Sequence, residues 1–166
     1  MAASSSGPTA IRLDGTAARD RPGVGLLVRS FLLGWAAGAR SSLGPGAPTV
    51  TGGGGPAVRI GAAAAIVGEL IADKLPIAPS RLAFGGDRLR AASGAIGASM
   101  LAGRADAQRL LPVLAGAVGG FVAAHAGASW RAWAAGRMPD LRAALLEDAV
   151  ALAAAASACL PGRRSA

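Results

Sequence analysis

The sequence contains very few of the side chains from which disulfides and metal sites are built. Its 166 residues include one cysteine, Cys159, and one histidine, His125. A single cysteine cannot form a disulfide within the chain, and a structural or catalytic zinc site needs three or four protein ligands. We therefore predict that the chain binds no metal and no other cofactor.

Lysine and tyrosine are also scarce. Tyrosine is absent, and Lys74 is the single lysine among 17 cationic residues, which outnumber the 9 acidic ones. One interpretation of the resulting net charge of +8 is that the chain binds nucleic acid. The arginines, however, are scattered through the polar gaps between apolar segments, and no nucleic-acid-binding motif accompanies them. This pattern argues against a nucleic-acid partner and is typical of cations in loops between membrane helices.

Charged residues make up only 16% of the chain, against roughly 25% in an average soluble domain. The alternation of valine, isoleucine or threonine that would indicate strands is absent. Five apolar segments are present instead, at residues 24–43, 57–75, 89–103, 108–130 and 139–160. They predict an all-α fold, a small polytopic membrane helical bundle with four or five transmembrane helices. The alternative, a soluble all-α bundle, would need charged outer faces that the later segments lack.

The chain divides by composition into three parts. Residues 1–22 form a polar, disordered N-terminal arm without the apolar core of a signal peptide, residues 23–161 a membrane helical domain, and residues 162–166 a short basic tail. Residues 43–57 contain four consecutive glycines and no cation, which predicts a flexible loop. The positive-inside rule then favours a multi-pass protein of the cell (inner or plasma) membrane, with a cytoplasmic N-terminus and this loop outside.

Carboxylates stand inside two of the apolar segments. Glu69 and Asp73 are four residues apart and share a helix face, and Glu147 and Asp148 lie early in the last segment. A charge at the bilayer centre costs roughly 2.5–3.5 kcal/mol on insertion scales, so these acids need partners, protons or water. Cation counts do not decide between four and five spans, but five spans bring all four acids to one depth. Arg40 is the matching buried cation.

Four stretches of the chain carry a resemblance to known sequences. They are GWAAGARSS at 34–42, GELIADKLPIAPSR at 68–81, RAASGAIGAS at 90–99 and LLEDAVAL at 145–152. Together they resemble a bacterial membrane family catalogued as domain of unknown function 4126, and the second stretch is the specific part. The resemblance implies an integral membrane protein without an assigned activity. The matching positions are Gly38, Arg40, Ser41, Glu69, Asp73, Lys74, Pro76, Pro79, Arg81, Arg90, Ser93, Gly94, Glu147 and Asp148.

Two groups of candidate residues follow from these patterns. The candidates for a buried polar network are Arg40, Ser41, Glu69, Asp73, Lys74, Arg81, Arg90, Glu147 and Asp148. The candidates for close helix packing are Gly38, Ser93, Gly94 and Gly97. Small residues let helices approach closely, and such faces fit contacts within one chain and contacts in a homo-oligomer equally well.

The sequence leaves more than one function open. The network fits a small transporter or channel-like protein with a proton or cation path among the Glu, Asp and Arg side chains. The alternative is a structural or accessory membrane protein whose charges only fix helix packing. A membrane enzyme acting on lipid phosphates would need an Asp-rich metal motif that the sequence lacks, so we expect no enzymatic activity. The expected partner is the lipid bilayer, and the substrate is left open.

Overall fold

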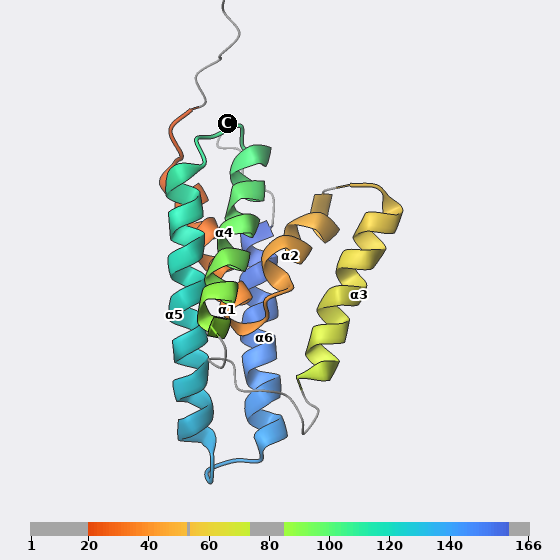
Figure 1. Cartoon of the computed structure of the whole chain (residues 1–166), viewed down its shortest axis with the longest axis vertical. Helices are drawn as coiled ribbons and strands as arrows, with labels where there is room; N and C mark the ends of the chain where they lie inside the picture. The colour runs from red at the N-terminus through yellow and green to blue at the C-terminus, as the bar shows by residue number, and fades with distance from the viewer. Residues whose placement is uncertain (1–19, 53, 74–84, 160–166) are drawn as a thin grey trace, which may run out of the picture.

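The computed structural model describes residues 20–52, 54–73 and 85–159, and these residues form six helices and no strand (Figure 1). The helices are α1 (Val24–Ala39), α2 (Leu43–Gly52), α3 (Pro56–Ala72), α4 (Gly86–Arg104), α5 (Leu110–Ala134) and α6 (Asp140–Cys159). The predicted all-α class is thus confirmed for the described part of the chain. Nearly all of the predicted N-terminal arm, and all of the predicted basic tail, lie outside it.

The five apolar segments of the sequence form α1, α3, α4, α5 and α6, close to their predicted bounds. α3 begins with Pro56 in its first turn, where the missing N–H would have had no partner within the helix. α4 follows Gly85, whose φ of 78° is a conformation that glycine adopts readily. α6 begins at Asp140 directly after Pro139, as these two residues predict. Local proline and glycine signals therefore mark the starts of α3, α4 and α6.

The prediction of a flexible loop at residues 43–57 is wrong for residues 43–52, which form α2, and for residues 56–57, which begin α3. Pro48 lies inside this helix and leaves the Gly44 carbonyl without its usual backbone donor. The helix is held by its neighbours: a Cβ built at Gly97 of α4 would lie 2.7 Å from the Gly44 carbonyl carbon. Such close packing along a glycine face overrides the weak intrinsic helix preference of glycine and proline.

α1 and α2 form a hairpin whose two outer ends lie at the same end of the bundle. Before α1, the Asp20 carbonyl accepts a hydrogen bond from the Gln108 N–H at 3.0 Å. At the end of α2, the Arg104 guanidinium donates to the Pro48 carbonyl and, at 3.3 Å, to the Thr51 hydroxyl. Because Arg104 and Gln108 flank the short connection from α4 to α5, the chain enters and leaves the hairpin at this end (Figure 1).

This hairpin corrects the predicted path of the first segment. The sequence predicts that the N-terminal arm and residues 43–57 lie on opposite sides, with one crossing between them. In the structure the chain reverses at residues 40–42, because the backbone of Arg40 leaves the helix with φ −138° and ψ 110°. α1 has 16 residues, so this reversal lies about 24 Å from the start of α1, at 1.5 Å per residue.

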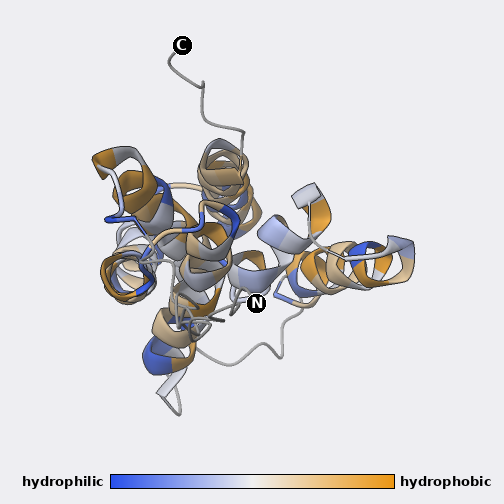
Figure 2. Ribbon diagram, turned by 90° about the horizontal axis from the view of Figure 1, so that it is seen from above, coloured by the Kyte–Doolittle hydropathy of each residue, from blue (hydrophilic) through white to orange (hydrophobic). Residues whose placement is uncertain are grey.

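The packing of side chains is the reverse of that expected in water. Apart from three leucines and Cys159, the buried hydrophobic residues are all alanines. Large aliphatic side chains lie on the surface instead, including Val24 at 77% exposure and Ile60 at 69%. In Figure 2 the hydrophobic segments reach the outer sides of the helices. A water-soluble domain normally buries valine, isoleucine and leucine first, and extended exposed apolar surface is typical of sites that contact a membrane or another protein.

The closest helix approach joins α1, α4 and α5 at three glycines. A Cβ built at Gly34 would lie 2.9 Å from the Gly116 Cα, and one built at Gly94 would lie 2.9 Å from the Gly34 Cα. A Cβ at Gly116 would lie 2.6 Å from the Ala98 Cβ. Real Cβ atoms do not approach other atoms this closely, so only glycine fits. Small residues at helix crossings of this kind allow backbones to meet directly.

One described helix, α5, is both long enough and apolar enough to cross a membrane, and α1 is apolar but shorter. α5 has 25 residues and is about 37 Å long, which exceeds the bilayer core of about 30 Å. The four or five spans expected from the sequence therefore remain a prediction.

The glycine contact predicts a contrast between two substitutions. Gly116→Ala should lower the free energy of unfolding by about 1–3 kcal/mol or more, because a methyl group forced into filled space strains the packing. Gly68→Ala on α3 is the matched control, since a Cβ there would meet nothing within 4 Å and alanine favours helix by about 1 kcal/mol. Thermal unfolding midpoints under identical solvent conditions provide the comparison. Equal effects of the two substitutions would contradict the packing of α1, α4 and α5.

Candidate functional site

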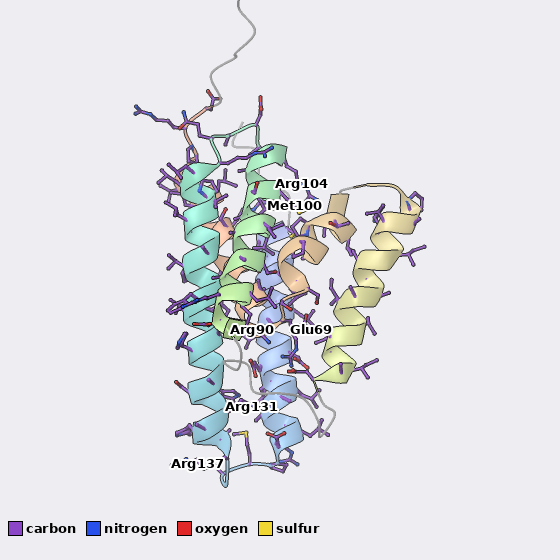
Figure 3. The ribbon with its side chains drawn as sticks, viewed as in Figure 1. Glu69, Arg90, Met100, Arg104, Arg131 and Arg137 are labelled. Carbon is purple, nitrogen blue, oxygen red and sulfur yellow. The ribbon has the colours of Figure 1, made fainter. Side chains whose placement is uncertain are left out.

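The turn between α1 and α2, which we call the tip, consists of Arg40, Ser41 and Ser42. It connects two helix ends in the interior of the bundle, and Figure 3 shows Glu69 and Arg90 beside it at mid-height, between Arg104 toward one end and Arg131 toward the other. A helix end leaves four backbone groups without partners inside the helix. Two ends therefore meet here, and both need partners from elsewhere in the fold.

Arg40 is the most deeply buried charged residue described, with 1% of its surface exposed. Its guanidinium lies 2.6 Å from a carboxylate oxygen of Asp73, at the end of α3, and forms a second ion pair with Asp148 of α6. It also donates a hydrogen bond to the Ala39 carbonyl at 2.9 Å. One cation thus joins α3 and α6 to the tip, and burial makes each of these contacts stronger than it would be in water.

Glu69 caps the N-terminal end of α2. Its carboxylate accepts hydrogen bonds from the Ser41 N–H at 2.8 Å, the Ser42 N–H at 2.7 Å and the Ser41 hydroxyl at 2.9 Å. The N-terminal N–H groups of a helix carry partial positive charge and favour an anion. A carboxylate from α3 therefore provides the cap that no residue of α2 itself supplies.

Arginines meet the C-terminal end of α1 in the complementary way. The Arg90 guanidinium donates to the carbonyls of Gly38 at 3.1 Å and Ala39 at 2.8 Å, where the helix carries partial negative charge. The Ser93 hydroxyl, one turn further along α4, donates to the Ser41 carbonyl. The two opposed helix ends at the tip are thus matched by side-chain charges of opposite sign from α3 and α4.

A cavity of about 440 Å³ lies next to the tip, between α5 and α6. Its volume falls within the range of roughly 300–1,000 Å³ that is usual for small-molecule sites. The indole N–H of Trp130 donates to the Ala143 carbonyl at 3.2 Å and links α5 to α6 at the end of the cavity remote from α1. The main lining residues are Trp35, Ala39, Ala126, Trp130, Leu146 and Val150, and Glu147 also lines it.

The structure brings most of the predicted network residues together around the tip. They are Arg40, Ser41, Glu69, Asp73, Arg90 and Asp148. Glu147 lies beside Asp148 on α6 at the cavity wall, with both carboxylate oxygens buried. The described part of the site therefore holds two arginines and four carboxylates, while Lys74 and Arg81 lie outside the described residues.

The predicted packing residues occupy helix contacts around the same turn. A Cβ built at Gly38 would lie 2.5 Å from the Gly120 carbonyl oxygen of α5, and the contacts of Gly94 and Gly97 are given above. Ser93 contributes a hydrogen bond as well as small size. Among the described residues, no group of three or more His, Cys, Asp or Glu side chains is placed to hold a metal ion.

Sequence reasoning missed two features of the site. The first is Ser42, whose N–H binds Glu69. Its only signal in the sequence was its place as the second serine of GARSS. The second is the cavity lined by Trp35 and Trp130. The sequence gave no signal for it, because the cavity depends on the distance between α5 and α6.

Comparisons with protein families, with curated proteins and with solved structures give no match.

The ion pairs of Arg40 predict that it contributes far more to the free energy of unfolding than an arginine in a surface pair. Arg40→Gln leaves the buried Asp148 and the partly exposed Asp73 without this cation and should lower the free energy of unfolding by about 3–5 kcal/mol. The control is Arg131→Gln, since Arg131 pairs with the exposed Asp140 at 3.5 Å, and such pairs contribute about 0–1 kcal/mol. Chemical denaturation of both variants provides the test. A loss for Arg40→Gln no larger than that of the control would show that these ion pairs do not hold the tip.

Proposed function

We propose that the chain is an integral membrane protein and that the α1–α2 hairpin is re-entrant, entering and leaving the bilayer on one side. The proposal is supported by the alanine and glycine interior and the exposed large aliphatic side chains, which suit a lipid environment. Non-helical backbone at membrane depth is tolerated where protein covers it, and the tip, buried at Arg40 and half-buried and hydrogen-bonded at Ser41 and Ser42, suits that condition. The resemblance to the family of domain of unknown function 4126 favours the same class.

We further propose that the protein is a small transporter or channel-like protein, with the tip as the polar centre of its path for protons or small cations. The observation that carries this proposal is the buried Arg40 with ion pairs to α3 and α6 at a helix break. Ionised residues inside a membrane protein are expensive, and broken helices with charged partners are typical of substrate and ion sites in transporters. The excess of carboxylates over arginines in the described site favours a cation over an anion.

A structural or accessory role is the second candidate, and one observation favours it. Among the described residues, the hydrogen bonds of Glu69 and Arg90 go to the tip and to the end of α1, so these charges are already used to close helix ends. In this role the cluster only fixes the hairpin against α3, α4 and α6. Neither proposal assigns a chemical reaction to the chain.

The re-entrant hairpin predicts the sidedness of three positions. In a Cys159→Ala background, Arg21→Cys and Gly55→Cys should react with an impermeant maleimide from the same side of the membrane. Ala135→Cys, at the turn between α5 and α6, should react only from the other side. All three positions are exposed. Labelling of Arg21→Cys and Gly55→Cys from opposite sides would show that residues 24–52 cross the bilayer once, and would remove the re-entrant hairpin.

The transport proposal predicts loss of flux when the carboxylates around the tip are neutralised. In proteoliposomes, Glu69→Gln and Glu147→Gln should reduce proton or monovalent-cation flux about tenfold or more, the effect of losing roughly 1.4 kcal/mol of interaction with the passing ion. Asp140→Asn is the control, because Asp140 is an exposed acid on the same chain and should leave flux unchanged. Thermal unfolding of each variant separates lost flux from lost structure.

The two candidate functions differ in the double variant Arg40→Gln/Asp148→Asn. A structural role predicts that removing both partners restores stability and membrane level relative to Arg40→Gln and leaves no further defect. The transport role predicts a protein that is folded yet without flux. If the wild-type protein carries no ion or small solute across liposomes, the structural candidate takes its place.

A further inference from the structure

We propose that the cavity between α5 and α6 holds one acyl chain of an anionic phospholipid, whose phosphate is bound by arginines at the α5–α6 turn. This inference depends on the membrane location in the proposed function and is independent of transport. It identifies a lipid site beside the tip, in a cavity whose wall includes Glu147.

The opening and the lining of the cavity suit a hydrocarbon chain from the surrounding bilayer. Two of its lining residues, Leu146 and Val150, are 52% and 57% exposed, so the cavity opens outward between α5 and α6. Trp35 and Ala39 of α1 close it at the end near the tip. Apart from Glu147, the residues that line it are apolar, and the carboxylate oxygens of Glu147 are themselves buried. An uncharged chain therefore fits better than a polar ligand.

The charges beyond the cavity identify the headgroup. Trp130, which lines the cavity, donates a hydrogen bond to the Ala143 carbonyl. Arg131 follows Trp130 in the chain, and Arg142 precedes Ala143. Arg137 lies at the same end of the molecule as Arg131 (Figure 3). A basic cluster next to a membrane surface attracts anionic headgroups.

The local contacts of these arginines leave charge available for a phosphate. Arg131 pairs with Asp140 at 3.5 Å and also donates to its carbonyl, and Arg137 donates to the Trp133 carbonyl and lies 5.1 Å from the centre of the Trp133 ring. Arg142 is exposed. The segment from Arg131 to Arg142 therefore carries three arginines and one aspartate. The rings of Trp130 and Trp133 stack with centroids 5.3 Å apart, as suits residues at the depth of lipid headgroups.

The test uses tryptophan fluorescence, because the chain has three tryptophans and two of them line the cavity. The full-length protein is reconstituted with equal mole fractions of phosphatidylglycerol and phosphatidylcholine, and the bromine label is placed on the acyl chains of one lipid or the other. We expect stronger quenching when phosphatidylglycerol carries the bromine. Mass spectrometry of lipids that remain with the detergent-purified protein should show the same preference and requires no tryptophan substitution.

Two pairs of variants locate the site. Ala126→Phe, which fills the cavity, should abolish the difference between the two lipids, whereas Val118→Phe on the exposed side of α5 should not. Arg137→Gln/Arg142→Gln should reduce the preference for phosphatidylglycerol by about fivefold for each arginine lost. The matched control, Arg88→Gln/Arg109→Gln, changes two exposed arginines of other segments and should leave the preference intact.

The outcomes separate this inference from the proposal of a membrane location. Equal quenching by the two brominated lipids, or a preference unaffected by both Ala126→Phe and Arg137→Gln/Arg142→Gln, would overturn the lipid site while the protein still floats with vesicles. A protein that does not float with vesicles at all would overturn the membrane location itself. A preference for phosphatidylglycerol that Ala126→Phe removes would establish the site.

Discussion

The rest of the structure depends on the match between charged side chains and the two helix ends that meet at the tip. A helix break in an apolar interior leaves N–H and C=O groups without partners, and each unmatched group costs roughly as much as a lost hydrogen bond. Glu69 binds the donors at the start of α2, and Arg90 binds the acceptors at the end of α1. Without these residues the hairpin would have no stable place to turn inside the bundle.

The alanine and glycine interior follows from the same constraint. The α1–α2 hairpin must fit among α4, α5 and α6, and contacts such as that of Gly34 with Gly116 bring the backbones together with no side chain between them. Backbones this close exclude large side chains, which then point outward. In lipid such an arrangement has no hydrophobic penalty, since the bilayer solvates leucine and valine as well as a protein core does.

The sequence predicted the elements whose signals are local. Pro139 and Asp140 predicted the start of α6, and the spacing of Glu69 and Asp73 predicted that both lie on one face of a helix. In the structure both contact the tip. α2 could not be predicted, because glycine and proline at residues 44–48 favour a loop and only the contact with α4 makes them helical. The pairing of Arg40 with Asp148 joins residues more than a hundred positions apart, so their meeting depends on the fold and not on any local pattern.

The position of α3 connects the two candidate functions. Within the described residues α3 has no fully buried residue, although its Ile66 packs against the core cluster, so its apolar contact with the bundle is limited. Its attachment near the tip therefore rests largely on Glu69 and Asp73, the same carboxylates that stabilise the helix ends. In a purely structural protein these contacts stay closed. In a transporter they must open and re-form, and a helix held by a few ionic contacts can be released at less cost than a helix held by a packed apolar face.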